Sequence, residues 1–284
     1  MSKTAKIWLI IATISLFLGT AICLGAILYS GGSFDKISTT KYQTNTFDIS
    51  ESFNSISVDV STADIEFIVS ETGECKVECF EQKNLTHNVE VLNGVLNISN
   101  TDNRTWRDFF GLNFKSSKVK VYLPSSEYQN VIINASTSDV NICQGFTFNS
   151  VQIAVTTGDV NVKNVNALED FIISVTTGDV NVRNVTAKKF TSKGDTGDVY
   201  LYNVVAVEHI TIERSTGDVE FESIDAPNIF IKTSTGDVEG SVKTGKTFNA
   251  KSSTGRVRVP SSTEGGTFVI ETDTGDIRVI VSNN

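Results

Sequence analysis

The sequence predicts an all-β fold, a parallel β-solenoid (β-helix-like) with coils of about 19–20 residues, preceded by one N-terminal transmembrane helix. Three observations support this fold class. The motif TGDV and its close variants return at nearly constant spacing from residue 157 onward. The segments between the motifs are rich in Val, Ile, Thr, Ser and Asn, a bias that favours strands and turns over helices. Residues 7–29 contain no charged side chain.

The N-terminal segment, residues 1–29, is expected to be a cytoplasmic stub followed by a transmembrane signal-anchor. A helix over residues 7–29 would reach about 34 Å, enough to cross a hydrocarbon core of about 30 Å. A secretory signal core is usually shorter and ends at a small-residue cleavage site, which this sequence lacks. Lys3 and Lys6 precede the span, so the positive-inside rule places everything after Tyr29 outside the cytoplasm. A cleaved signal peptide is the alternative.

Residues 30–46 are expected to form a flexible linker, and residues 47–284 the solenoid domain. All 33 acidic residues lie in this exported part, together with all but two of the 24 Lys and Arg residues. An acidic surface argues against a nucleic-acid partner and against adsorption to anionic lipid. The expected localisation is therefore the cell membrane, with a single span and an extracytoplasmic C-terminal domain.

Nine copies of the repeat share one frame, aligned on the glycine of TGD. The first copy has Ala63 in this column, the second has Ser138, and the penultimate copy has Gly255 followed by Arg256. In all nine, the preceding residue is threonine. The six copies that keep the whole motif contain these corner residues: Thr157, Gly158, Asp159; Thr177, Gly178, Asp179; Thr196, Gly197, Asp198; Thr216, Gly217, Asp218; Thr235, Gly236, Asp237; and Thr274, Gly275, Asp276.

Each copy alternates apolar and polar residues, as expected for strands with one buried face. A repeat of this length cannot bury its own apolar face, so the copies must stack. Glycine supplies the positive φ that a corner between two short strands often needs. A second corner is expected at Asn164, Asn184 and Asn203, because asparagine tolerates left-handed φ. The difference between 19- and 20-residue copies is expected in the loop opposite the TGD corner.

The aspartate column allows two interpretations. Each aspartate can cap its corner by accepting hydrogen bonds from backbone amides. Alternatively, carboxylates stacked about 4.8 Å apart could hold cations such as Ca²⁺. One carboxylate per coil offers too few ligands for an ion that prefers about 6–8 oxygen atoms, so we favour the cap. Arg256 replaces aspartate in one copy and is expected to pair with Asp237 or Asp276.

The threonine column raises the separate question of an ice-binding surface. These threonines share the parity of the buried positions in their strands, and this argues against such a surface.

Residues 70–130 depart from the repeat and are expected to form a hairpin and an aromatic insert or cap. VEVLNGVLNI (89–98) predicts a hairpin with a type I′ turn at Asn-Gly. RTWRDFFGLNFK (104–115) either plugs the open end of the solenoid or forms an exposed interaction tip. The residues of this candidate tip are Trp106, Arg107, Phe109, Phe110 and Phe114.

The chemistry-bearing residues do not indicate an enzyme. His87 and His209 are isolated in the sequence, and the chain shows no nucleophile elbow, metal triad or phosphate loop. Cys75 and Cys79 would lie about 13 Å apart on a strand, too far for a disulfide without a bend. A long-range disulfide that also involves Cys143 is left open. No catalytic residue, metal ligand or cofactor is predicted.

The serial TTGDV motifs, the VKVYLP strand at 118–124 and the N-terminal anchor resemble a bacterial β-strand-repeat family. This family is labelled "putative adhesin", is also called the toastrack domain, and has no agreed biochemical activity. The resemblance covers roughly residues 50–280 and is specific for the fold, because eight copies follow in register after residue 130. It implies a membrane-tethered exported solenoid, often associated with the envelope stress response.

Two function classes follow. The first is a non-enzymatic envelope module that binds a partner protein, within a membrane stress-sensing complex. The second is a surface adhesin or glycan-binding module that uses one solenoid face. Aromatic side chains in one outer column would favour the glycan, whereas an isolated aromatic tip near the membrane would favour a protein. Tyr200, Tyr202 and Phe221 are scattered rather than aligned in one column of the repeat, so the protein partner is preferred.

Overall fold

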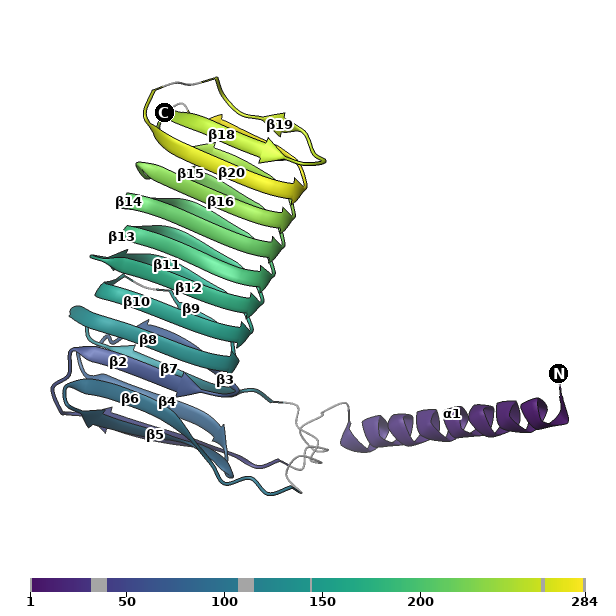
Figure 1. The fold of residues 1–284 in the computed structure, drawn as a ribbon. Coiled ribbons are helices and arrows are strands. Elements are labelled where there is room, and N and C mark those ends of the chain that lie inside the picture. Colours follow the sequence, from purple (N-terminus) through teal and green to yellow (C-terminus); the bar gives the residue numbers. More distant parts are fainter. Residues whose placement is uncertain (1, 32–39, 107–114, 144, 262–263, 283–284) are drawn as a thin grey trace.

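The computed structural model describes residues 2–31, 40–106, 115–143, 145–261 and 264–282, and it confirms the predicted fold class. One apolar helix precedes a long stack of β-coils (Figure 1). We call the end of the stack formed by the strands nearest the helix in sequence the base, and the opposite end the distal end.

Helix α1 (Lys3–Ser30) is the predicted apolar segment. Ser2 caps its first turn by accepting a hydrogen bond from Ala5 N–H at 3.2 Å, and Gly31 ends it in the left-handed conformation. Residues Lys3–Tyr29 have a mean hydropathy of 2.4, and none of the apolar window is buried by the rest of the chain. A helix of this length and composition can cross a membrane, and near an N-terminus it is equally compatible with a signal sequence.

Two long faces form the solenoid, and almost all pairing within them is parallel. Face A contains the strands before each TGD corner. From base to distal end its order is β5 (Leu85–Leu92), β6 (Val95–Asp102), β2 (Ser55–Val60), β8 (Glu127–Thr137), β10 (Phe146–Thr157), β12 (Asp170–Thr177), β13 (Val180–Thr196), β14 (Val199–Thr216), β16 (Asn228–Thr235), β20 (Gly266–Thr274) and β18 (Lys246–Ser252).

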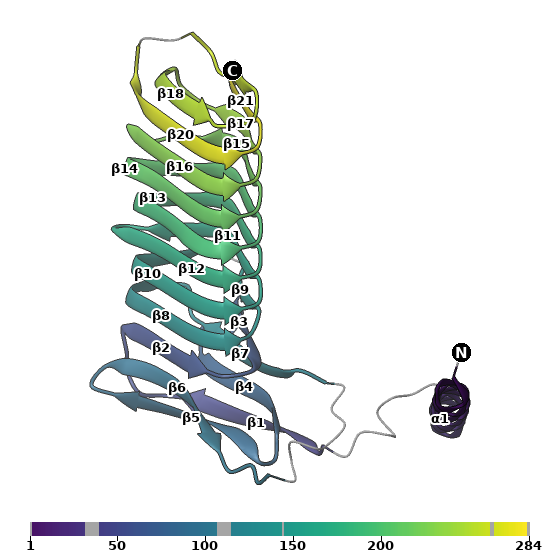
Figure 2. The same cartoon turned by 45° about the vertical axis from the view of Figure 1, so that its right-hand side comes forward.

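Face B contains the strands after each TGD corner, and β13 and β14 are long enough to contribute to both faces. Its order is β1 (Tyr42–Ile49), β4 (Cys75–Gln82), β7 (Ser117–Leu123), β3 (Ala63–Val69), β9 (Val140–Ile142), β11 (Val160–Ala167), β13, β14, β15 (Val219–Ile224), β17 (Val238–Val242), β21 (Ile277–Val281) and β19 (Val257–Arg258). Figure 2 shows the strands of both faces stacked along the solenoid.

The predicted corners are confirmed. Gly158, Gly178 and Gly197 have φ between 128° and 141°, and Asn164 has φ 55° at the second corner. A short third side follows this second corner, where Val165 pairs with Phe146. The register between β13 and β14 shifts after Ala187, on the far side from the TGD corner. The extra residue of a 20-residue coil is therefore accommodated opposite the TGD corner, as expected.

Identical frame positions stack into ladders inside the solenoid. In one ladder Phe171 pairs with Phe190, and their ring centroids are 5.8 Å apart. Ser192 interrupts the apolar column and is fully buried, where its hydroxyl accepts a 3.0 Å hydrogen bond from Arg214. Gly240 interrupts another column because the ring of Phe221 occupies the space that a Cβ would need.

Chain order and stacking order differ at both ends. β20 lies between β16 and β18, and β21 lies between β17 and β19. At the base, β2 and β3 are covered by β6 and β7, which follow them in sequence. At the distal end the chain forms the outer coil first and then returns to form the coil inside it. At the base it forms the inner coil first and then the outer one.

The base differs from the repeat, as expected for residues 70–130. Asn93 and Gly94 both have positive φ and join β5 to β6, which confirms the type I′ hairpin. β1 starts at Tyr42 and pairs antiparallel with β4. Residues 42–46 of the expected linker are therefore part of the folded domain, because this strand covers the open edge that β4 would otherwise expose.

Candidate functional site

The aspartate column forms one ladder along the TGD corner. Oδ1 of each aspartate accepts a hydrogen bond from the backbone N–H at the same frame position in the next coil toward the distal end. The donors, with N···O distances, are Asp139 (3.2 Å), Asp159 (2.9 Å), Asp179 (2.8 Å), Asp198 (2.8 Å), Asp218 (2.8 Å), Asp237 (2.8 Å), Asp276 (2.7 Å) and Arg256 (2.8 Å). Each aspartate thus caps a backbone N–H of the neighbouring coil, an arrangement that supports the cap interpretation.

The threonine column is exposed, so the parity argument was wrong. Thr157, Thr177 and Thr196 are all exposed, although they pair in register on face A. Two consecutive residues point outward here, as with Thr156 and Thr157, because the backbone leaves the regular pleat as it approaches the corner. The argument from burial against an ice-binding surface therefore fails.

The candidate aromatic tip lies mostly outside the described residues. Arg107, Phe109, Phe110 and Phe114 fall in residues 107–114, whereas Trp106 is described and is 69 % exposed. On the other side of this segment, the Lys115 carbonyl accepts a 2.5 Å hydrogen bond from the hydroxyl of Tyr42. Tyr42 begins β1, directly after the linker, so the segment joins the domain beside the point where the tether arrives.

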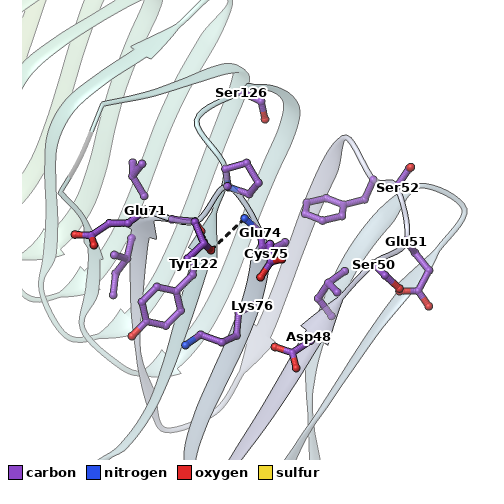
Figure 3. Close-up of a pocket in the computed structure, with 18 of the residues that line it drawn as sticks. Asp48, Ser50, Glu51, Ser52, Glu71, Glu74, Cys75, Lys76, Tyr122 and Ser126 are labelled. Atoms are coloured by element: carbon purple, nitrogen blue, oxygen red, sulfur yellow. Dashed lines mark hydrogen bonds between the residues drawn. The ribbon is translucent and has the colours of Figure 1, made fainter.

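The base contains a cleft with a volume of about 1180 Å³. It lies between the β1–β2 connection, the β3–β4 turn and the loop after β7 (Figure 3). Asp48, Glu51, Glu71 and Glu74 line it with exposed carboxylates. Three aromatic residues, Phe53, Tyr122 and Tyr128, also line the cleft.

Lys76 is the one basic residue among those that line the cleft. Its ammonium group lies 2.6 Å from Glu78, and this hydrogen bond raises the pKa of Lys76 and lowers that of Glu78. Because Glu78 is paired with the positive charge of Lys76, the electrostatic potential of the cleft is mainly negative.

A second polar cluster is buried at the base, and the sequence interpretation of His87 as isolated was wrong. Nδ1 of His87 lies 2.7 Å from Glu81 Oε2, and the His87 backbone N–H donates to the same oxygen at 2.7 Å. Asn45 donates to the other carboxylate oxygen at 2.5 Å. Donor atoms of Cys79, Glu81 and His87 lie within 4.8 Å of one another.

Burial governs the chemistry of this cluster. Cys79 and Glu81 are 0 % exposed and His87 is 6 % exposed. Burial, followed by the charge of Glu81, raises the pKa of the Cys79 thiol to about 12. The sequence signal that could have found the cluster is the pair Cys79 and Glu81, two apart on a strand and hence on one face, followed by a tight turn that returns His87.

Tyr200 and Tyr202 lie two residues apart on the outer side of β14. Their partners in the adjacent coils are Asn181, Glu220, Arg183 and Glu222, so the two tyrosines do not belong to an aromatic column, as predicted. Tyr202 is 41 % exposed, and the Arg183 guanidinium lies 5.9 Å from its ring centroid. Tyr200 donates a 3.0 Å hydrogen bond to Asp198, and burial together with this bond raises its pKa to about 12. Phe221 is buried and instead packs against Phe268 inside the solenoid.

A shallow groove of about 560 Å³ includes both tyrosines. Charged residues of the neighbouring coils complete its lining, with Glu220, Glu222 and Glu239 among the acids and Arg183 and Arg278 among the bases.

Comparison with known proteins gives a family match over nearly the whole solenoid. The family described as Toastrack DUF4097 matches residues 53–204 and again residues 166–284. No curated protein matches the chain.

Solved structures are also similar to this chain. A crystal structure of a "putative adhesin" from Bacteroides fragilis NCTC 9343 has 19 % identity and a TM-score of 0.56, and the match covers 84 % of this chain and 97 % of that one. At this identity the likeness concerns the fold alone. A "putative adhesin" from Parabacteroides distasonis ATCC 8503 has 15 % identity and a TM-score of 0.48, over 86 % and 98 % of the two chains.

Proposed function

Because this chain belongs to the Toastrack DUF4097 family, we propose that it is a membrane-anchored, exported and non-enzymatic module that binds a protein of the cell envelope through the base of its solenoid. Helix α1 is the anchor, with Lys3 and Lys6 on the cytoplasmic side and the solenoid outside. The family match supports a surface or interaction module.

The acidic cleft at the base is the observation that carries this proposal. The repeat forms two regular outer faces, whereas the base breaks the repeat and opens a cleft of about 1180 Å³. Four exposed carboxylates and three aromatic residues suit a partner segment that combines Lys or Arg with apolar side chains. The partner is therefore an envelope protein with a basic, partly apolar segment.

The position of the cleft suits a partner in or near the membrane. Eleven residues, 31–41, separate the end of α1 from β1. Fully extended, they would reach at most about 40 Å, so the base stays close to the bilayer surface. Trp106, the described residue of the predicted aromatic tip, is exposed, and Lys115 is hydrogen-bonded to Tyr42 at the end of the same tether.

Site-specific photocrosslinking of the full chain in cells tests this proposal. A photoreactive residue at Ser52, on the cleft, should give an adduct with an envelope protein, and one at Gln152, exposed on face A, should not. The double charge reversal Glu71→Lys and Glu74→Lys should remove the Ser52 adduct. The matched reversal Glu222→Lys and Glu239→Lys on face B should leave it intact. Adducts that ignore the cleft charges would contradict the proposal.

A glycan-binding surface is the second candidate, favoured by the groove at Tyr200 and Tyr202. An exposed tyrosine ring beside carboxylates and guanidinium groups offers the stacking and hydrogen-bonding chemistry that sugars need. Calorimetric titration of the full chain with envelope polysaccharide fragments tests it. Binding that is lost in Tyr202→Ala and kept in Glu71→Lys would favour this surface over the cleft.

A role in a membrane stress-sensing complex remains a prediction. If the partner belongs to such a complex, deleting the gene should change the response of a cell-wall stress reporter. The cleft reversal Glu71→Lys with Glu74→Lys should then reproduce the deletion. A normal response in both strains would leave the module outside stress sensing.

A further inference from the structure

We propose that Cys79, Glu81 and His87 form a metal-binding site, with Zn²⁺ as the ion that their chemistry fits. Cys79 and Glu81 lie two residues apart on β4 and point to the same side of the strand. The chain then turns into β5 and brings His87 beside them. One donor atom from each residue lies within 4.8 Å of the other two, so a small adjustment would place all three around one ion.

The two ring nitrogens of His87 have different surroundings. Nδ1 faces Glu81 at 2.7 Å, whereas Nε2 is buried and has no hydrogen-bond partner among the described residues. An ion shared with Glu81 would bind Nδ1, because the two ring nitrogens point in different directions. The ion would then join this nitrogen to a thiolate and a carboxylate that are equally inaccessible to water.

The ligand set indicates which ion the site would select. Thiolate, imidazole and carboxylate together are typical of Zn²⁺, which accepts sulfur, nitrogen and oxygen ligands. Ca²⁺ and Mg²⁺ prefer oxygen alone. The two negative charges of the thiolate and the carboxylate would balance the charge of the ion. Asn45, opposite Cys79 in the register of β1 and β4, is close enough to orient Glu81 from the neighbouring strand.

A purely structural hydrogen-bond network is the competing interpretation. Glu81 accepts hydrogen bonds from Asn45 and, at 3.5 Å, from Gln43, as well as from His87. Such a network would tie β1, β4 and β5 together without any ion. Cys79 distinguishes the two interpretations: it is a ligand in the metal site but only a packing residue in the network.

Cobalt substitution of the full chain, purified in detergent, tests the proposal. Protein unfolded with chelator and refolded with Co²⁺ should retain one ion per chain and show a thiolate-to-cobalt charge-transfer band, and Zn²⁺ should abolish this band. In Cys79→Ser the band should disappear. Cys75→Ser is the matched control, since Cys75 is also buried on β4 but lies outside the cluster, and it should keep the band.

His87→Gln should lower the affinity for Co²⁺ at least tenfold. Refolded wild-type protein that binds no Co²⁺, or binds it without a thiolate band, would overturn the proposal. A band lost in Cys75→Ser and kept in Cys79→Ser would do the same. The wild-type measurement decides the matter even if a variant fails to fold.

Discussion

Arg256 lies directly beyond Asp276 in the stack, although it precedes Asp276 by 20 residues in the chain. Its guanidinium contacts Oδ2 of Asp276 through Nε at 3.2 Å and Nη2 at 3.0 Å, and its backbone N–H donates to Oδ1 at 2.8 Å. Of the two partners that the sequence left open, Asp276 is therefore the observed one. Asp237 instead accepts from the N–H of Asp276.

This contact places an arginine at the distal end of the ladder. Every other described member of the ladder is an aspartate, and like charges stack poorly at such spacing. Arg256 thus neutralises Asp276, the last carboxylate of the column. It lies in the outermost coil, and no aspartate of the ladder lies beyond it.

The Arg256–Asp276 contact predicts a pH-dependent effect on stability. The backbone N–H and guanidinium of Arg256 lower the pKa of Asp276, so the contact stabilises the fold above the ordinary aspartate pKa of about 3.9 and loses this effect as pH falls through the lower folded-state value. Arg256→Gln should therefore lower the melting temperature at pH 7 by a small, salt-sensitive amount, because Arg256 is 73 % exposed. Near pH 2 the two proteins should melt together. A difference that persists unchanged into acid would contradict the assignment.

The topology of the anchor predicts the fate of the solenoid in intact cells. Protease added to protoplasts that express the full chain should remove the C-terminal domain, because the positive-inside rule applied to Lys3 and Lys6 predicts a cytoplasmic N-terminus. A fragment containing α1 should remain in the membrane fraction. Full protection of the domain would show that the orientation is reversed, and complete release of the domain before protease is added would show that the segment is a cleaved signal peptide.

Gly197 is expected to be intolerant of a side chain. Its φ is 128°, and an added Cβ would overlap the carbonyl oxygen of Gly178 in the preceding coil. Gly197→Val should destabilise the protein by more than the roughly 1–3 kcal/mol of the backbone strain alone. Gly145→Val is the matched control, since nothing lies within 4 Å of its Cβ position. Equal thermal midpoints for the two variants would show that the corner does not require glycine.

The aspartate ladder predicts indifference to calcium. Asp179 accepts a backbone hydrogen bond from Asp198 at 2.8 Å, and an asparagine oxygen can accept the same bond. Asp179→Asn should therefore cost at most about 1 kcal/mol. Millimolar Ca²⁺ should leave the melting temperature of both proteins almost unchanged. A rise of several degrees with Ca²⁺ that disappears in Asp179→Asn would establish a cation site instead.

The buried Arg214 is expected to lower the stability of the fold. Its side chain lies inside the solenoid, where burial lowers its pKa to about 10, and its Nε has no hydrogen-bond partner among the described residues. Arg214 donates to the buried hydroxyl of Ser192, so the two residues should be replaced together. Arg214→Met with Ser192→Ala should be neutral or stabilising by about 1–4 kcal/mol, as found when buried charges and their partners are replaced by apolar groups of similar volume. Arg183→Met, on the outer side of face B, should change the free energy of unfolding by less than about 0.5 kcal/mol. A clear loss of stability in the double variant would give the buried guanidinium a necessary role.

The regular part of the solenoid could be predicted from the sequence because its determinants are local. Glycines such as Gly197 and asparagines such as Asn184 recur at regular intervals and indicate the positions of positive φ. The alternation of apolar and polar side chains between them indicates which face is buried. The Asn-Gly pair at residues 93–94 specifies its own turn. Each of these conclusions depends on a backbone requirement that one or two residues satisfy by themselves.

The candidate sites could not be predicted in the same way, because each joins residues from different strands. The cleft combines the β1–β2 connection with the turn after β3, and Tyr200 and Tyr202 acquire Arg183 as a neighbour only through the parallel register of β13 and β14. The threonines were predicted to be buried because a regular strand was assumed. The alternation of the pleat ends one residue before the corner, so these side chains point outward.

By itself, the sequence determined the apolar N-terminal helix, the coil length, the corners and the side chains that fill the interior. Only the tertiary structure decided the order of the coils at the two ends, where β20 is inserted between β16 and β18 and β2 is covered by β6. Coils with the same frame offer the same hydrogen bonds to one another, so local sequence does not distinguish between stacking orders. The order is settled by which arrangement buries the outer apolar surfaces and brings groups far apart in the chain, such as Asn45 and Glu81, into one cluster.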